Sequence, residues 1–137
     1  MDKLRIISGP YVFEARFETA AAPKTCTIFK RLLPYENKVI HVRWSGEAVW
    51  IPLGELDLGL SNENQTSYPA PGQMIVYPGG LSETEILLAY GGVHFASKVG
   101  QLAGNHFITF TSGLDRLPEF GKSTLWEGAK AIRIEAV

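Results

Sequence analysis

The sequence is short of several features that mark common classes of protein. It holds one cysteine, which excludes an internal disulfide. No apolar run approaches the roughly 20 residues of a membrane span, and the first residues, MDKLRIISG, lack the apolar stretch of a signal peptide. The net charge is −1 and no basic stripe is present. We therefore expect a cytoplasmic protein whose partners include neither nucleic acid nor a membrane.

Familiar catalytic and metal-binding motifs are also missing. The sequence has no Gly-x-Ser-x-Gly, no phosphate-binding loop and no dinucleotide glycine motif. His94 and His106 have acidic residues within reach in principle, but no tight ligand spacing such as His-Glu-x-x-His supports a metal site. We predict no metal and no cofactor, and we interpret His106 as a hydrogen-bonded structural histidine at the start of a strand.

The composition is that of one ordinary globular domain. Of 137 residues, 45% are hydrophobic and 20% are charged, without repeats, low-complexity tracts or linkers. A chain of this length buries roughly two-thirds of its unfolded surface, so it needs no disulfide or metal for stability. We expect a single domain over residues 1–137.

Strand-like segments dominate the chain. Two of them flank Gly9-Pro10, and the second alternates so that Tyr11, Phe13, Ala15 and Phe17 share one face, which predicts a hairpin. A second hairpin is predicted around Gly46. The further strand candidates are residues 37–45, 47–54, 73–80, 84–92, 105–113 and 129–137. Between them, residues 55–72 are predicted to be a long irregular loop and residues 93–104 a loop with a helical turn.

One helix is well marked, at residues 23–33. Pro23 suits a first helical turn, and Lys30 and Arg31 near the other end complement the helix dipole. Pro34 then ends the helix. Apolar residues fall at spacings of four, three and four: Ala22, Cys26, Phe29 and Leu33. The pattern predicts about three turns with Phe29 and Cys26 buried.

The element order predicts a mainly β protein. Eight strands are enough for a closed antiparallel barrel that side chains just fill. A weaker helix, interrupted by Pro118, is predicted within residues 114–128. We therefore expect an eight-stranded barrel capped by one or two helices.

The segment FETAAAPKTCTIFKRLLP resembles the second strand and first helix of cyclophilins. Ala22-Pro23-Lys24-Thr25 and Phe29 match that family residue for residue, and residues 113–135 are weakly similar to its second helix and closing strand. WSGEAVWIPL and PGQMIVYPGG resemble atypical bacterial cyclophilin-like proteins of unknown function. The resemblance implies a cyclophilin-like barrel that binds ligand on its outer face.

The sequence departs from the cyclophilin isomerases at their catalytic motifs. The Gln-Gly-Gly-Asp-Phe step and the Asn-Gly-Ser-Gln-Phe-Phe strand have no convincing counterparts, and only Arg43 lies near the expected arginine. We therefore predict a binding protein without ordinary prolyl isomerase activity. A divergent prolyl isomerase is the alternative.

Strand parity places candidate ligand-binding residues on the outer face. The residues expected to fill the barrel are Ile40, Val42, Trp44, Val49 and Ile51. His41, Arg43 and Trp50 then point outward together. An arginine beside an aromatic ring can hold an anionic or amide-bearing ligand; an arginine stacked on a surface tryptophan is the plain alternative.

Acidic residues after a glycine pair complete the predicted site. Glu83 and Glu85 follow Gly79-Gly80, and His94 follows Gly91-Gly92 at the other end of the same strand. The spacing of Ser82 and Glu85 also suits a helix cap. The predicted ligand-binding set is Arg43, Trp50, Glu83, Glu85 and His94, for a small molecule or a peptide. A small enzyme using Glu and His in acid–base chemistry is a further alternative.

Self-association is a final expectation. Strand parity exposes Trp50 and Phe107, and the apolar strand at residues 84–92 adds outward hydrophobic surface. Because such patches mark interfaces, we predict a homo-oligomer.

Overall fold

The computed structural model describes residues 2–137. Its first two strands, β1 (Lys3–Ser8) and β2 (Tyr11–Phe17), pair as an antiparallel hairpin around Gly9-Pro10. Phe13, Ala15 and Phe17 are buried and the residues between them are exposed. The alternation in the sequence therefore predicted this hairpin and its buried face correctly.

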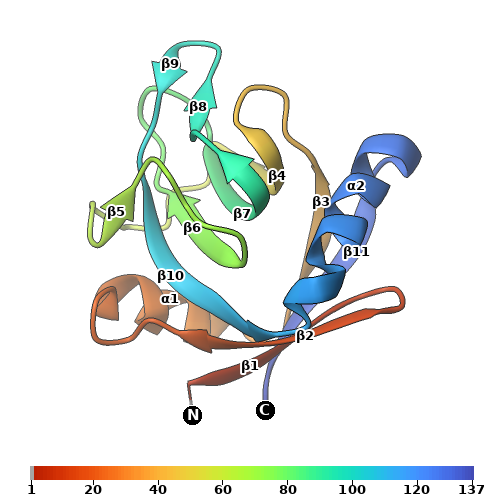
Figure 1. Ribbon diagram of the computed structural model, residues 1–137. Helices are drawn as coiled ribbons and strands as arrows, with labels where there is room; N and C mark the ends of the chain where they lie inside the picture. The colour runs from red at the N-terminus through yellow and green to blue at the C-terminus, as the bar shows by residue number, and fades with distance from the viewer. Residues whose placement is uncertain (1) are drawn as a thin grey trace.

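Eight long strands close into an antiparallel barrel, which confirms the expected fold class (Figure 1). Around the barrel the order is β2-β1-β11-β3-β4-β7-β6-β10, and β10 pairs with β2 to close it. The remaining long strands are β3 (Tyr35–His41), β4 (Gly46–Gly54), β6 (Gln73–Tyr77), β7 (Thr84–Val93), β10 (Gly104–Ser112) and β11 (Lys130–Ala136). Three two-residue strands are additional: β5 (Gln65–Thr66), β8 (Ala96–Ser97) and β9 (Gly100–Gln101).

The helix α1 (Pro23–Leu32) packs Phe29 into the barrel core, as predicted. The Phe29 ring is 2% exposed and its centroid lies 4.6 Å from that of Phe107. Cys26 is also buried, and burial raises the pKa of its thiol to about 11. Phe107 was expected to face outward, and this was wrong: it is fully buried in the barrel interior.

The N-terminal end of α1 is held by the long loop at residues 55–72. The helix has no cap from its own preceding residue. Instead, Thr25 donates from its backbone N–H and its hydroxyl to Glu63 Oε1, over 2.6 and 2.7 Å. The amide of Asn105 donates to the Thr25 hydroxyl (3.2 Å) and to the carbonyl of Ser61 (2.9 Å). The threonine of the Ala-Pro-Lys-Thr segment thus ties the loop to the helix. The loop is irregular apart from β5, as predicted.

The second helix, α2 (Leu117–Glu127), follows a short 3-10 turn, η1 (Leu114–Arg116). Pro118 was expected to interrupt this helix, but it lies in the first turn, where a missing N–H costs nothing. Phe120 packs on Phe13, with ring centroids 5.8 Å apart. Gly121 lies against the Tyr90 ring so closely that an added Cβ would come within 2.1 Å of it. Glycine is therefore what lets α2 dock on the barrel.

The segment from 93 to 104 forms a small hairpin, β8 with β9, and not the helical turn that was expected. Its flanking residues Phe95 and Leu102 are buried, and they cover the outer faces of β4, β6 and β7. We call the resulting second set of buried side chains the outer cluster; it comprises Ala48, Ile75, Tyr77, Leu87, Phe95 and Leu102. The apolar strand β7 is consequently buried on both faces, and of the surface on which self-association was predicted only the half-buried Trp50 remains. No helix within residues 2–137 is both long and apolar enough to cross a lipid bilayer.

Candidate functional site

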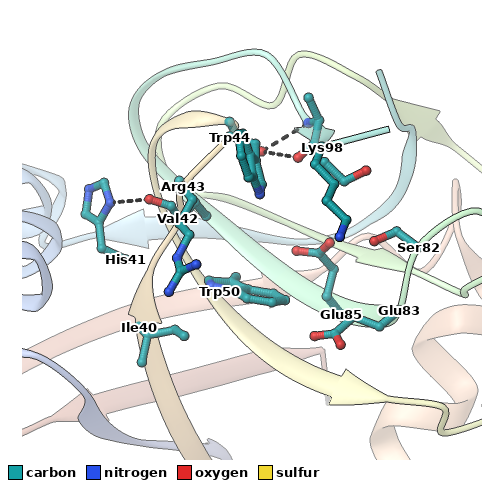
Figure 2. Close-up of a pocket in the computed structure, with 13 residues that line it drawn as sticks. Ile40, His41, Val42, Arg43, Trp44, Trp50, Ser82, Glu83, Glu85 and Lys98 are labelled. Atoms are coloured by element: carbon teal, nitrogen blue, oxygen red, sulfur yellow. Dashed lines mark hydrogen bonds between the residues drawn. The ribbon is translucent and has the colours of Figure 1, made fainter. Parts of the chain in front are cut away.

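A cavity of about 380 Å³ opens at the end of the outer cluster, and we call it the outer cavity (Figure 2). Its walls come from the end of β3 and the turn after it, from Trp50 on β4, from the segment that enters β7, and from the β8–β9 hairpin. Of the predicted site residues, it brings together Arg43, Trp50, Glu83 and Glu85. Four residues predicted from the sequence as ligand-binding thus line one cavity.

Trp50 forms one wall of the cavity because β4 alternates as expected. Val49 and Ile51 lie in the barrel core, whereas Trp50 packs against the outer cluster. On β3 the expected parity was wrong. Val39 is the buried core residue, so Ile40, opposite Trp50, faces outward with it. Arg43 reaches the same side because it lies beyond the end of β3, where strand parity no longer applies.

His41 was expected on the outer face with Arg43, but both of its ring nitrogens form hydrogen bonds within the protein. Its Nδ1 lies 2.8 Å from the carbonyl oxygen of Val42, so Nδ1–H donates there. Its Nε2 then accepts from the hydroxyl of Tyr90 over 2.7 Å. In Figure 2 the ring lies at the edge of the cavity residues, joined to the Val42 carbonyl by this hydrogen bond. We interpret His41 as a residue that fixes the backbone next to Arg43.

Glu85 is the unusual group of the cavity. It is 6% exposed, and among residues 2–137 its carboxyl has no hydrogen bond and no ion pair. Burial, with a smaller effect from Glu83, raises its pKa to about 8. At neutral pH the group is therefore mostly a neutral carboxylic acid, which can both donate and accept a hydrogen bond.

Two cations border the cavity. Arg43 is exposed and forms no ion pair within the described part of the chain. In the view of Figure 2, Arg43 lies beside Trp50, and Lys98 extends from the opposite wall toward Ser82 and Glu85. Lys98 was not recognised in the sequence, because nothing in the spacing of residues 93–104 indicates that they form a hairpin over the barrel.

A single serine joins two of the cavity walls. The Ser45 hydroxyl donates to the carbonyl of Ala96 and accepts from the Ala96 N–H, each over 3.0 Å. The backbone carbonyl of Ser45 also accepts from His94 N–H over 3.0 Å. The turn that carries Arg43 and the hairpin that carries Lys98 are thus fixed relative to each other.

The segment that leads into β7 borders a second hollow of about 480 Å³. Ser82 and Glu83 line both this hollow and the outer cavity, so the two adjoin. Ser82 does not cap a helix, since a strand follows it. Gly79 and Gly80 have φ values of 94° and 124°, which favour glycine and shape this turn.

His94 lies outside the cavity. The next residue, Phe95, fills the outer cluster, so the exposed His94 projects the other way, where it stacks on Tyr68 and binds Gln101 Oε1 over 2.8 Å. His106 bonds Thr109 over 2.8 Å, and burial lowers its pKa, in agreement with a structural role. Within residues 2–137, no three His, Cys, Asp or Glu side chains gather as a metal site.

Comparison with solved structures shows the fold in two other proteins. The structure of McbB in complex with tryptophan has a TM-score of 0.74 and 18% identity; the match covers 98% of this chain and 46% of McbB, so the chain spans about half of that protein. The hypothetical protein AF2241 from Archaeoglobus fulgidus has a TM-score of 0.64 and 14% identity, over 98% of this chain and 94% of AF2241. No curated protein matches the sequence. Over residues 4–136 the sequence matches a protein family of unknown function, DUF3830, and the chain belongs to that family.

Proposed function

We propose that this protein binds a small ligand with an anionic or amide group in the outer cavity. The observation that carries the proposal is Glu85: a residue that is 6% exposed, whose carboxyl has no partner among residues 2–137, in the same cavity as Arg43. Arg43 offers a planar set of donors for a carboxylate, and Glu85 offers a donor and an acceptor for an amide.

Energetics favour a ligand role for Glu85 over a structural one. Burial of Glu85 disfavours its charged form, which costs stability as the pH rises through its pKa. Such groups with shifted pKa values concentrate at functional sites. The cavity, at about 380 Å³, also lies within the usual range of small-molecule sites.

The similarity to McbB supports the proposal by analogy. Its structure is a complex with tryptophan, an amino acid that carries a carboxylate, an amine and a planar ring. At 18% identity the likeness concerns the fold, and sites differ widely on shared folds. The residues of the outer cavity therefore carry the argument, and the analogy adds a ligand of suitable size and chemistry.

A second candidate function is acid–base catalysis by Glu85. Its pKa of about 8 is the specific observation in favour, because a general acid or base works best when its pKa is near the operating pH. The sequence had offered His94 as a further acid or base, but His94 lies outside the cavity. Arg43 would hold the substrate while Glu85 moves a proton. A turnover that follows the titration of Glu85 and is lost in Glu85→Gln would establish catalysis.

Ligand-observed NMR with a panel of small carboxylates, amides and amino acids tests binding. N-acetylglycine is the simplest probe with both groups. We expect Arg43→Ala to weaken binding of the carboxylate probes by about 1.5–3 kcal/mol, the worth of a charge-assisted hydrogen bond. Arg31→Ala, which removes an exposed arginine on α1, is the matched control and should change nothing. Equal affinities for wild type and Arg43→Ala would rule out this site.

A further inference from the structure

We propose that the ligand is an N-acylated aromatic amino acid unit, with its ring against Trp44 and Trp50, its carboxylate on Arg43 and its amide at Glu85. This inference rests on the proposed function and adds to it that one ligand carries all three groups. Each group is assigned from a separate feature of the outer cavity.

The ring is assigned from the two tryptophans. Trp44 and Trp50 both line the cavity. Trp44 is 58% exposed and Trp50 is half-buried. Among residues 2–137, neither indole packs on another aromatic ring or on a cation, whereas Tyr11, Phe13, Phe29 and Tyr90 all have such partners. Aromatic rings bind best to other rings in offset or edge contacts. Two indoles without ring partners beside one cavity therefore select a planar apolar group.

The carboxylate is assigned from Arg43. It lies beside Trp50 in Figure 2, and it forms no ion pair within the described residues. The other arginines near carboxylates are paired: Arg16 with Glu18, Arg116 with Glu119, and Arg133 with Glu36. Arg43 shares a cavity with Glu83 and Glu85 and pairs with neither. Its guanidinium remains available to a carboxylate that enters next to the ring.

The amide is assigned from Glu85. Trp50 is opposite Leu87, and Glu85 lies two residues before Leu87 on the same face of β7, so Glu85 is diagonal to Trp50. Because Glu85 is 6% exposed and no cation pairs with its carboxyl, the neutral acid is its favoured form. A neutral acid donates to a carbonyl and accepts from an N–H, which are the two polar groups of a secondary amide.

The acyl group has room to leave the cavity. Ser82 and Glu83 border both the outer cavity and the adjoining hollow of about 480 Å³. A substituent on the amide nitrogen can pass over these residues into that hollow. The same unit could be a free N-acyl amino acid or the C-terminal residue of a peptide, since both present an acylated nitrogen, an aromatic side chain and a carboxylate.

The test uses four probes that differ by one group at a time. N-acetyl-L-phenylalanine carries all three groups, N-acetyl-L-alanine lacks the ring, N-acetyl-L-phenylalaninamide lacks the carboxylate, and hydrocinnamate lacks the amide. Tryptophan fluorescence reports binding, with the exposed Trp126 on α2 as a constant background. We expect N-acetyl-L-phenylalanine to bind about tenfold or more tightly than each of the other three, since ring burial and a charge-assisted bond are each worth that much.

Variants identify the residue responsible for the affinity gained from each ligand group. Arg43→Ala should remove the preference for the carboxylate, and Trp44→Ala the preference for the ring; Trp44 is largely exposed, so its loss should leave the fold intact. Glu85→Met should remove the preference for the amide, whereas Glu85→Gln, which still donates and accepts, should keep it. A tripeptide, acetyl-Gly-Gly-Phe, identifies the source: tighter binding than N-acetyl-L-phenylalanine assigns a peptide end, and equal or weaker binding assigns the free amino acid derivative.

The outcomes separate this inference from the proposed function. If N-acetyl-L-alanine or hydrocinnamate binds as tightly as N-acetyl-L-phenylalanine and Arg43→Ala weakens it, the inference is overturned and the binding function stands. If none of the four probes binds up to its solubility limit, the inference is overturned. The binding function is then decided by the wider panel of carboxylates and amides.

Discussion

Glu85 lies diagonally across from Trp50 on the outer face of the barrel, and nothing in the described chain satisfies its carboxyl. A fold can accommodate such a group only at a cost in stability. The cost should be visible in the pH dependence of unfolding.

We predict that Glu85→Gln is more stable than the wild type at alkaline pH and about equally stable near pH 4. The pKa of Glu85 is about 8 in the folded protein and 4.5 ordinarily, so the folded state holds the proton more tightly. The contribution of this group is therefore fully present below pH 4.5 and is lost as the pH rises through 8. The full loss is on the order of 5 kcal/mol, and glutamine does not titrate.

Urea denaturation from pH 4 to pH 9 measures this difference. Glu14→Gln, on the exposed side of β2, is the matched control and should follow the wild type at every pH. Parallel pH profiles for Glu85→Gln and the wild type would show that Glu85 titrates normally.

Phe29→Ala should lower the free energy of unfolding by about 3–5 kcal/mol, because a fully buried ring is removed and a cavity is left against Phe107. Leu32→Ala, on the same helix but 40% exposed, should cost about 1 kcal/mol or less. Chemical denaturation compares the two variants, and similar losses would contradict the assignment of Phe29 as the side chain that anchors α1.

We expect no measurable prolyl isomerase activity. The β3–β4 hairpin and the segment after it lack the Gln-Gly-Gly-Asp step of the isomerases, although Arg43 lines the cavity. A chymotrypsin-coupled assay with a proline-containing peptide measures the rate. A rate within an order of magnitude of ordinary cyclophilins would contradict the expectation.

Self-association remains a prediction, but the surface that we expect to mediate it is now the end of α2. Phe107 and β7 are buried, but Leu125 and Trp126 at the end of α2 are 53% and 82% exposed. Contiguous exposed apolar patches mark interfaces, and these two neighbouring side chains are the candidate. Light scattering should give a mass above that of a monomer at tens of micromolar, reduced by Trp126→Lys and unchanged by Val99→Lys on the β8–β9 tip. A wild-type protein that is monomeric at this concentration would contradict the prediction.

The fold was largely predictable because its signals are local. Pro23 and Pro34 mark the limits of α1, and the alternation from Tyr11 to Phe17 fixes the buried face of β2. The parity of β3 was not predictable. Val39, Ile40 and Val42 are all apolar, so alternation cannot decide which of them enters the core, and one step of register reverses every side chain.

The candidate site was predictable only in part. Trp50 faces outward because β4 alternates as predicted. Arg43 reaches the same cavity although the predicted alternation of β3 was wrong, because it lies in the turn after that strand. Lys98 depends on the two-residue strands β8 and β9, which are too short to leave a periodic pattern. The segment that forms the β8–β9 hairpin also directs His94 away from the cavity.

The outer cluster gives β4, β6 and β7 apolar contacts on both faces, so one sheet serves two separate cores. Side chains that point inward from these strands form the barrel core, while the outward Trp50 and Glu85 line the outer cavity. Outward positions of β4 and β7 can therefore change without disturbing the closure of the barrel. We predict that sequences of this family vary more at the outward positions of β4 and β7 than at the inward ones.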